Sequence, residues 1–506
     1  MPSRLGTIAF TASFLCVAPP VLARFRCPAK GGSQWHEYRS AHYVIFTDVG
    51  EFKLGRLVAQ LESMHTLEVQ ALVGEQVEIP GRLRVIALAD PGLFSDLAGQ
   101  YEIGGYFKYG FFSEPTIVLP VSGLDVDPEI VAHEVAHHIT RFFFVRQPPW
   151  FSEGLPEFLQ TVAAVDTPLE PRIGSHIVRG QRDHANAIGA VPRYMAQALQ
   201  EAPRVSFKEL FDWNGSADRE GGYHVYGWLL YHWLWNTRSK DLSAFQQRLS
   251  NGDDPADAWR ASFPDLDPAN AGAIAKVDDA LDAYRKSGRY MSYKVEAKAN
   301  ASVQKGELVA SSDVHMLLHD AANRWDEKER AANVEEALSE DVSQPAAIIL
   351  RARSIKSSPL EALRKSAAAR PNHWQAWLAV AGTLPDDAKE EKEAALRKAV
   401  ALNRDSAQAH NSLAWLLVTQ GRPKEALPIA NRAVDLMPTS PPMIDTLAAV
   451  AAAVGKCSEA LVLQRRAVAM APSEGDLAQN LRKRLGEYES RCGTAAPAAA
   501  SAVPPR

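Results

Sequence analysis

The sequence predicts an α+β domain, with a small sheet and many helices, followed by an all-α solenoid of helical repeats. Stretches typical of strands and of helices alternate up to about residue 120, which indicates a small sheet backed by helices. After that point the chain becomes predominantly helical, and its C-terminal third repeats itself at a fixed spacing. A chain of 506 residues is also too long to fold around one compact core, so two or three domains are expected.

The composition is that of an ordinary folded protein, with 46% hydrophobic and 23% charged residues. The formal net charge of -5 is small for this length, and no run of lysine and arginine is long enough to follow a phosphate backbone. These values argue against a largely disordered chain, and they make nucleic acid a poor candidate partner.

The first 23 residues have the features of a bacterial-type signal peptide. Arg4 supplies a positive charge, residues 5–18 are largely apolar, and small residues lead to a cleavage site at Ala23. An uncleaved anchor is the alternative, but threonines, a serine and two prolines interrupt the apolar stretch, whereas a spanning helix needs about 20 apolar residues. We therefore expect cleavage after Ala23 and export to the periplasm or the medium, with no stable membrane span left.

The elements of the first domain can be assigned in order. Residues 41–48 alternate and are rich in β-formers, so they predict a strand, and residues 51–74 follow with helical spacing of leucine and valine. Residues 82–88 and 117–119 predict two further strands. With the helical sequence that follows, these elements are expected to form one domain over residues 24–300.

A metal-binding pattern stands in the middle of the next predicted helix. Asp127 and Pro128 are a favourable cap and first residue, so the segment from His133 to His137, HEVAH, lies within the helix. Two histidines four residues apart lie on one helical face and can direct nitrogen atoms at the same zinc ion. Glu134 projects beside the metal, where it can reach water.

A catalytic zinc ion needs a third protein ligand and a fourth position for water. The sequence PPWFSEGLPEFL, over residues 148–159, offers Glu153 as the third ligand, and Glu157 follows it by four residues. With the helix cap and the export signal, this box favours a zinc site over a chance match to the five-residue motif.

From about residue 41 to about residue 290 the chain resembles the gluzincin clan of zinc metallopeptidases, the thermolysin-like enzymes, and particularly their bacterial peptidase MA-like members. The likeness is specific at the two boxes and loose elsewhere. It implies that residues 24–300 form a gluzincin-type peptidase domain that holds one zinc ion. It further implies three zinc ligands, one general base, and one carboxylate that orients a ligand, most naturally His133. These are His133, His137 and Glu153 as ligands, Glu134 as the base and Glu157 as the orienting group.

The resemblance also implies two features of substrate binding. The strand around Ile117 to Leu119 would be the sheet edge on which an extended peptide lies. The aromatic-rich helix over residues 221–235 would supply a donor to the oxyanion of the reaction. Tyr223 is the first choice for that donor, with His224 and Tyr226 as the alternatives.

Two features depart from the thermolysin-like pattern. Only 15 residues separate His137 from Glu153, which fits a shortened domain, and Pro156 stands where the family more often has alanine. If Ser152 caps the second helix, Pro156 lies near its first turn and is tolerated. If the helix begins earlier, Pro156 would bend the chain beside Glu153.

Other residues of the region fit structural roles better than catalytic ones. His138 points about 100° away from His137 around the helix, so a packed or solvent-facing position fits it better than a ligand role. His176 and His184 have no ligand spacing. An aromatic stripe on a buried helix usually packs in a core, and we expect this of Trp228, Trp233 and Trp235. For Tyr223, packing in the core is the alternative to the role of oxyanion donor.

The C-terminal third repeats with a period of 34 residues. Leu413, Gly421 and Pro438 recur as Leu447, Gly455 and Pro472. This period and pattern resemble tetratricopeptide repeats. We expect a helical connector over residues 301–345, a repeat domain with a capping helix over residues 346–492, and a disordered, low-complexity tail over residues 493–506.

Loss of the signal peptide leaves three cysteines, and an odd number allows at most one intrachain disulfide. Cys457 begins the second helix of the last repeat, and Cys492 ends the antiparallel helix that follows, so both fall at the same end of a helix pair. A Cys457–Cys492 disulfide is therefore predicted, with Cys27 as the remaining thiol.

The preferred function is an exported zinc-dependent endopeptidase or aminopeptidase in which Glu134 takes a proton from zinc-activated water. The repeats would bind the protein substrate or a protein partner. A catalytically silent scaffold that acts through its repeats is the alternative. Metal storage fits less well, because a single His-His-Glu site binds one ion.

Overall fold

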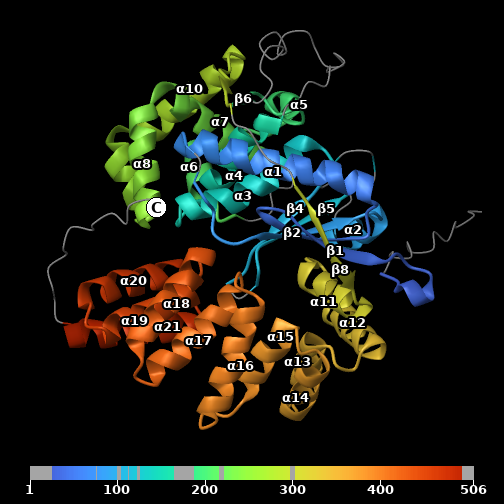
Figure 1. Ribbon diagram of the computed structural model, residues 1–506. Coiled ribbons are helices and arrows are strands. Elements are labelled where there is room, and N and C mark those ends of the chain that lie inside the picture. The colour runs from blue at the N-terminus through green and yellow to red at the C-terminus, as the bar shows by residue number, and fades with distance from the viewer. Residues whose placement is uncertain are drawn as a thin grey trace, which may run out of the picture.

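The computed structural model describes residues 25–492, except residues 76, 100–103, 112, 122, 124–125, 164–186, 216–220 and 297–301. It combines a six-stranded mixed sheet, a helical lobe and a C-terminal array of helix pairs (Figure 1). The predicted signal peptide over 1–23, the predicted tail over 493–506, His176 and His184 lie outside the described residues. Within the described part, no helix combines the length and the apolarity needed to cross a membrane.

The sheet has the strand order β4-β5-β3-β2-β1-β8, in which β2, β3 and β5 are parallel. The other three strands pair antiparallel with their neighbours. All residues of β3 are buried, as expected for a central strand covered on both faces. The predicted strands over 41–48, 82–88 and 117–119 are confirmed. The bounds are β1 Trp35–Arg39, β2 Tyr43–Thr47, β3 Leu83–Leu88, β4 Tyr106–Lys108, β5 Thr116–Pro120 and β8 Gln304–Val309.

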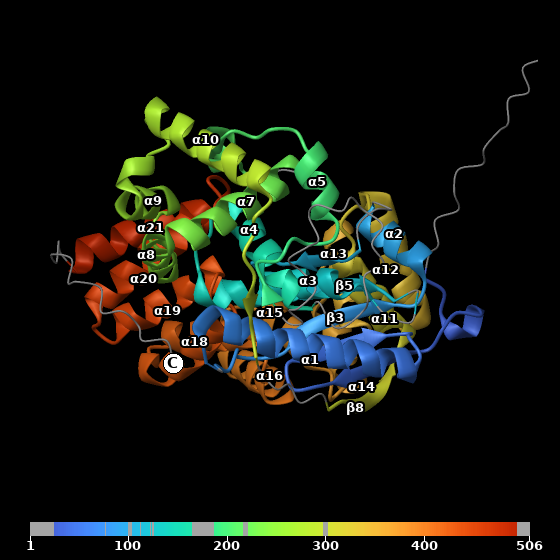
Figure 2. The same ribbon diagram turned by 90° about the horizontal axis from the view of Figure 1, so that it is seen from above.

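Helices cover both faces of the sheet. Ile117 and Leu119 of β5 pack with α1 and α3 in one core, whereas Val118 packs with α2 and α11 in another. This is the alternation of a strand with two buried faces. Figure 1 shows α1 above the strands and α11 below them, and Figure 2 looks down on α1 and α3 from above. The bounds are α1 Glu51–Val73, α2 Pro91–Ala98, α3 Pro128–Phe143 and α11 Ser311–Ala321.

The helical lobe packs around aromatic side chains. Trp150, Trp228 and Trp259 are fully buried, and Trp233 and Trp235 pack partly buried against the same core. The structural reading of the tryptophans on the aromatic-rich helix is therefore confirmed. The lobe contains α4 Pro149–Leu159, α5 Met195–Glu201, α6 Phe207–Asp212, α7 Gly222–Thr237, α8 Ser239–Asn251, α9 Pro255–Ser262, α10 Ala271–Ser287 and the short strands β6 Ala187–Ile188 and β7 Tyr293–Lys294.

Two glycines allow α4 and α7 to touch through their backbones. A Cβ atom added to Gly154 would fall on the carbonyl group of Gly227, and a Cβ on Gly227 would lie 3.0 Å from the carbonyl oxygen of Trp150. A larger residue at either position would force the helices apart. Gly154 follows Glu153 directly, so this contact fixes the position of Glu153 relative to α7.

The segment over 301–345 is not purely helical. It begins with β8, which pairs antiparallel with β1 and forms one edge of the sheet. It then forms α11, which packs on the sheet, and α12 (Glu327–Glu340). The prediction of a helical connector is wrong at its start, because the sequence of β8 is short and mostly exposed and carries no apolar pattern of its own.

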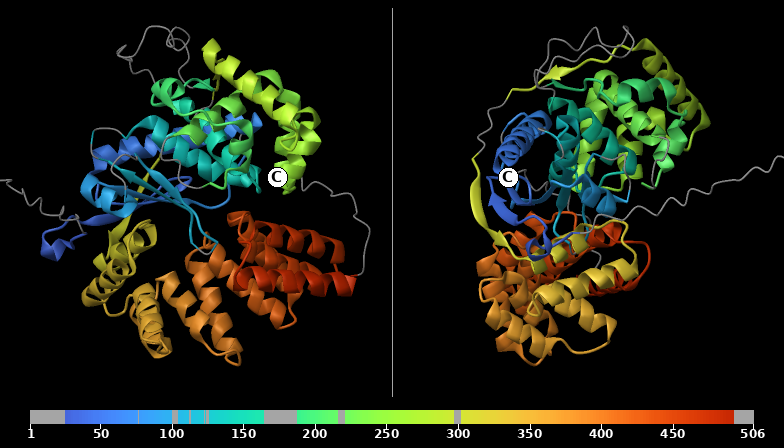
Figure 3. Two further views of the ribbon diagram at one scale, coloured as in Figure 1. Left: turned by 180° about the vertical axis from the view of Figure 1, so that it is seen from behind. Right: turned by 90° about the vertical axis from the view of Figure 1, so that its right-hand side faces the viewer.

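The C-terminal part consists of tetratricopeptide-type helix pairs. α17 and α19 begin at Ala407 and Pro441, and Gly421 and Gly455 adopt left-handed backbone in the tight turn of each pair. The predicted repeats are confirmed, and the pairs stack side by side (Figure 3). The helices are α13 Pro345–Ser354, α14 Leu360–Ala369, α15 Trp374–Thr383, α16 Lys389–Leu402, α17 Ala407–Thr419, α18 Pro423–Leu436, α19 Pro441–Ala453, α20 Cys457–Met470 and the closing helix α21 Asp476–Cys492.

Two of the cysteines have distinct states. Cys457 is disulfide-bonded, whereas Cys27 is a free, buried thiol whose Sγ lies 3.2 Å from Oε1 of Glu340. The side chain of Cys492 lies outside the described residues. The Cys457–Cys492 pairing therefore stays a prediction.

A buried carboxyl group on α1 predicts a pH-dependent stability. Glu68 is fully buried, and neither of its oxygens has a hydrogen-bond partner in the part of the chain that the structure describes. Burial raises its pKa well above the ordinary value, so the folded state holds the carboxyl protonated. The unfolded chain releases this proton above about pH 4.3. The free energy of unfolding should therefore fall by about 1.4 kcal/mol per pH unit from there up to the folded pKa.

Replacing Glu68 by glutamine should remove this contribution. The expected result is a flatter dependence of the free energy of unfolding on pH in the variant, measured by urea denaturation at several pH values above the ordinary glutamate pKa. Glu75→Gln, at an exposed position just beyond α1, is the control and should keep the slope of the native protein. Equal slopes for the native protein and Glu68→Gln would contradict the prediction.

Candidate metal centre

The helix that carries the HEVAH segment is anchored at its start and along one face. The side chain of Asp127 accepts a hydrogen bond from the backbone N–H of Glu129 (3.0 Å), and Pro128 is the first helical residue. The predicted cap is therefore confirmed. A fully buried face then fixes the rotation of the helix against the sheet and α1, and it consists of Val131, Ala132, Val135, Ala136 and Ile139.

Three side chains from α3 and α4 converge at one point. Nε2 of His133 and Nε2 of His137 are 3.0 Å apart, and Oε2 of Glu153 lies 3.7 Å from the first and 3.5 Å from the second. The two imidazole rings stand nearly perpendicular, at 86°. Within the described ranges, these three residues are the one group of histidine, cysteine or acidic side chains with metal-ligand spacing.

The donor set fits a zinc ion. Three atoms at about 2.0–2.1 Å from a tetrahedral zinc ion lie about 3.3 Å from one another, which is close to the three distances seen here. Two imidazole nitrogens and one carboxylate oxygen are also the ligand types that catalytic zinc sites use. All three side chains remain partly accessible, so a fourth ligand from solvent can reach the same point.

The charges around the cluster are arranged for a cation. Burial lowers the pKa of His133, but the hydrogen bond to Glu153 and the charges of Glu157 and Glu134 outweigh it and raise this pKa to about 9. Burial raises the pKa of Glu153, but the charge of His137 and hydrogen bonds from the surrounding histidines hold it well below the ordinary value. Three carboxylates thus surround two imidazoles, and a bound cation would offset this excess of negative charge.

Glu134 lies beside the cluster in a different environment. It is buried, and burial raises its pKa above the ordinary value. Its carboxylate accepts a hydrogen bond from the backbone N–H of Phe107 on β4. A carboxylate whose pKa is raised towards neutrality is a stronger base for proton transfer than an ordinary glutamate.

The helix that carries Glu153 begins earlier than a Ser152 cap would allow. α4 starts at Pro149 with Pro148 as its cap, and Pro156 lies inside it. Ser152 instead donates through Oγ to the carbonyl oxygen of Pro149 (3.1 Å). Pro156 cannot donate to the preceding turn, yet Glu153 still reaches both histidines.

Glu157 is held by three groups. Its Oε1 lies 3.9 Å from Nδ1 of His133 and accepts a hydrogen bond from the hydroxyl of Tyr194. Its Oε2 accepts one from Nε2 of Gln160 (2.5 Å). The resemblance implied the contact between Glu157 and His133. Tyr194 and Gln160 were not anticipated, and the i+3 spacing from Glu157 was a usable signal for Gln160.

Removing this support is expected to weaken metal binding. Glu157→Ala should lower zinc affinity about 10–100-fold, because partners that orient a ligand histidine typically contribute that much. Tyr194→Phe removes one of the two donors to Glu157 and should have a smaller effect. Competition with a chromogenic chelator measures the zinc affinity of both variants. Glu201→Ala, at an exposed position in α5, is the control. Unchanged affinity in Glu157→Ala would show that the carboxylate does not act on His133.

The aromatic-rich helix α7 presents a histidine to the cluster. Nε2 of His224 lies 3.5 Å from Oε2 of Glu153. Tyr223, the first choice for the oxyanion donor, instead stacks on Trp213 at 4.9 Å between ring centroids. Tyr226 is buried, and its hydroxyl accepts a hydrogen bond from Arg285. Of the three candidate donors, it is therefore His224, one of the two alternatives, whose side chain lies beside Glu153. It precedes Gly227 by three residues and so shares the face that touches α4.

The sheet edge at the cluster is β4. β5, which the resemblance implied as the edge, lies between β3 and β4 and is paired on both sides, so that expectation is wrong. The ring of Phe107 on β4 is stacked with His137 at 6.1 Å and is tilted to His138 at 6.2 Å. His138 is buried, and burial lowers its pKa to about 3, as suits a packed histidine.

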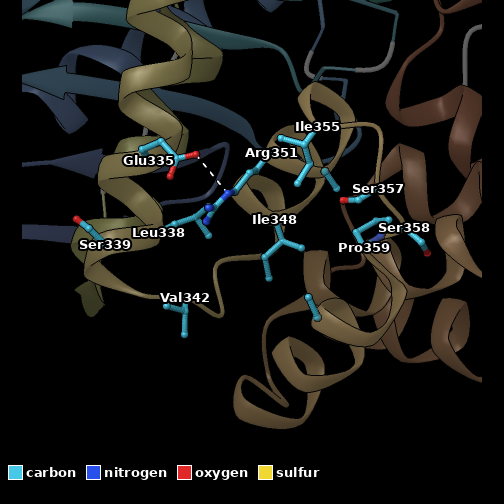
Figure 4. A pocket seen from close by; sticks show the side chains of 12 residues that line it. Glu335, Leu338, Ser339, Val342, Ile348, Arg351, Ile355, Ser357, Ser358 and Pro359 are labelled. Atoms are coloured by element: carbon cyan, nitrogen blue, oxygen red, sulfur yellow. Dashed lines mark ion pairs between the residues drawn. The ribbon is translucent and has the colours of Figure 1, made fainter.

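A separate cavity of about 400 Å³ lies in the first helix pairs, between α12, α13 and α14 (Figure 4). Leu338, Val342, Ile348 and Ile355 give it apolar walls, and an ion pair of 3.4 Å joins Glu335 and Arg351 across one side. None of the residues of the metal cluster lines it. It is therefore a feature of the repeats and not of the candidate metal centre.

The fold and the cluster define the class of this chain: a mixed-sheet domain with a His-His-Glu centre, joined to tetratricopeptide-type repeats. No protein-family model matches the sequence, and no curated protein matches it either.

Among solved structures, 42 chains match. One is TTC0263, a thermophilic TPR protein of Thermus thermophilus, with 20% identity and a TM-score of 0.26; the match covers 35% of this chain and 93% of that chain. Another is the assembly chaperone of RpL4, Acl4 (residues 1–338), with 16% identity and a TM-score of 0.20, over 52% of this chain and 98% of that chain. Scores this low support no conclusion about function.

Proposed function

We propose that this chain is an exported zinc-dependent peptidase of the gluzincin type. The observation that carries the proposal is the convergence of His133, His137 and Glu153 within ligand spacing, with the buried carboxylate of Glu134 beside them. Export rests on the signal-like sequence that ends at Ala23.

Each group near the cluster has a role in this reaction. Bound zinc would polarise a peptide carbonyl and lower the pKa of water. Glu134 would take the proton of the attacking water and later pass it to the leaving amine. His224 would donate a hydrogen bond to the oxygen of the carbonyl as it gains negative charge, a role first assigned to Tyr223.

The substrate would lie along β4. Extended peptides bind exposed sheet edges through backbone hydrogen bonds, and β4 is the sheet edge nearest the cluster. A peptide paired with this strand would cross the point where the three ligands meet. The choice between endopeptidase and aminopeptidase then depends on which groups close the two ends of this edge.

The test is cleavage of a mixed peptide pool by the native protein and by Glu134→Gln at equal zinc occupancy. Tight zinc uptake without any cleavage would instead favour the catalytically silent scaffold. The cavity between α12, α13 and α14 supports that second candidate, because Val342 and Ile355 expose 80% and 65% of their surface beside it. Concave apolar surfaces of this kind are typical of binding sites.

A further inference from the structure

The repeat domain contacts the sheet edge next to the metal centre. The segment that follows β4 extends to the turn between α18 and α19, as Figure 3 shows. There, Oγ1 of Thr439 donates a hydrogen bond to the hydroxyl oxygen of Tyr109 (2.6 Å). Oγ of Ser440 donates to the carbonyl oxygen of Phe111 (2.9 Å). Tyr109 also packs against an apolar cluster of the repeats that includes Leu436 and Met437.

The end of α11, in the segment before the repeats, contacts β4 itself. The hydroxyl of Tyr106 donates to the carbonyl oxygen of Ala321, at the end of α11 (3.1 Å). Nζ of Lys108 donates to the carbonyl oxygen of Ala322 (3.0 Å). The end of α11 therefore holds β4 itself, and the α18–α19 turn holds the segment that follows it.

β4 has little support of its own in the sheet. It is three residues long and, among the strands that the structure describes, pairs with β5 alone. Its central residue, Phe107, contacts the candidate site through the stacking of its ring with His137 and through the hydrogen bond of its backbone N–H to Glu134. A shift of β4 would thus move a wall of the metal centre.

One arginine links the two sets of contacts. The guanidinium of Arg141, one turn after His137 on α3, lies 4.2 Å from the ring centroid of Tyr109 and 5.4 Å from that of Phe107. Cation–π contacts of this kind hold a ring in place beside a charged group. Thr439, Tyr109 and Arg141 therefore form a continuous path from the repeats to the helix that carries His133 and His137.

The repeats also contact the N-terminal domain at other points. Arg82, before β3, lies 3.4 Å from Asp405. The side chain of Arg466 on α20 packs beside Gly252 in the helical lobe, and burial lowers the pKa of Arg466 to about 10. The repeats thus contact both the sheet and the helical lobe.

We infer that Tyr109 is a positioning residue through which the repeats hold β4 against α3, and with it the wall of the metal centre formed by Phe107. The repeats would then act on the centre within the same chain, through the buried contacts of the α18–α19 turn. The effect on catalysis rests on the proposed peptidase function, whereas the effect on β4 does not.

The test removes one hydrogen bond. Thr439→Val and, separately, Tyr109→Phe should speed hydrogen–deuterium exchange in the fragment from Tyr106 to Tyr109 roughly 2- to 10-fold, the range expected for loss of one buried hydrogen bond. Thr439→Ser keeps the hydroxyl and should restore protection. Thr446→Val is the matched control, because Oγ1 of Thr446 donates within α19, to the carbonyl oxygen of Pro442.

A second readout separates positioning from general stability. The visible spectrum of the Co²⁺-loaded protein should change in Thr439→Val and stay unchanged in Thr446→Val, and exchange in β2 should be the same in all variants. Native exchange rates for the β4 fragment in both Thr439→Val and Tyr109→Phe would overturn the inference, as would faster exchange in β2 of the same size. Failure of the protein to bind metal or to cleave peptides would refute the peptidase proposal and leave the exchange result in place.

Discussion

Replacing Glu134 by glutamine is expected to lower kcat for peptide hydrolysis by about 10²–10⁴-fold, the usual contribution of a positioned general base. Glutamine has nearly the same shape and still accepts the hydrogen bond from Phe107, but it cannot take a proton from water. Zinc affinity should change little, because Glu134 is not among the three converging ligands. The variant therefore separates catalysis from metal binding.

The measurement is the set of products from a mixed peptide pool, read by mass spectrometry after both proteins are brought to equal zinc occupancy. Glu129→Gln is the matched control on the same helix, since Glu129 accepts a hydrogen bond from the backbone of Arg193 (2.9 Å) and does not touch the cluster. It should keep native activity. Indistinguishable products and rates from the native protein and Glu134→Gln would end the catalytic proposal.

Replacing His137 by alanine is expected to abolish the stabilisation that zinc gives the folded protein. A ligand that binds only the folded state adds about 2.7 kcal/mol to the free energy of unfolding at a concentration 100-fold above its Kd. His137→Ala leaves one imidazole and one carboxylate. Zinc affinity should then fall by more than the about 100-fold expected for loss of an orienting partner.

Thermal unfolding with and without zinc measures this effect. His138→Gln is the control, because His138 is a neighbour on the same helix that packs on Phe107 and Phe142 and contacts no ligand atom of the cluster. It should lower Tm through lost packing and still show the zinc-dependent rise. The same zinc-dependent rise in His137→Ala would show that the metal, if bound, lies elsewhere.

Local sequence patterns were sufficient to predict the central residues of the candidate metal centre. The cap at Asp127 and the four-residue spacing of the histidines depend only on helix geometry, and the structure keeps both. The repeats could be predicted equally well from the sequence, because each pair of helices has its own apolar pattern and turn glycine. Glu153 was found because it lies in a distinctive box shortly after the helix.

The residues that sequence reasoning missed depend on long-range pairing. The edge strand of the sheet is β4 because β4 pairs with β5 on the side away from β3. The glycine-rich sequence before β4 has no alternating pattern that would predict this strand. Tyr194, the residue before α5, reaches Glu157 from far along the sequence, which no local spacing indicates. The choice of Tyr223 over His224 followed a family tendency, whereas the contact between Gly154 and Gly227 decides which face of α7 meets α4.

The order in which this sheet is completed has a consequence for synthesis of the chain. Side chains on its second face, such as Ile86 and Val118, share a core with Val314 and Leu318 of α11, more than 190 residues after Val118 along the chain. A growing chain therefore carries an uncovered apolar surface until that helix emerges. During this interval, unpaired strands are open to association with other chains, so a holding chaperone would be most useful before residue 321 is released.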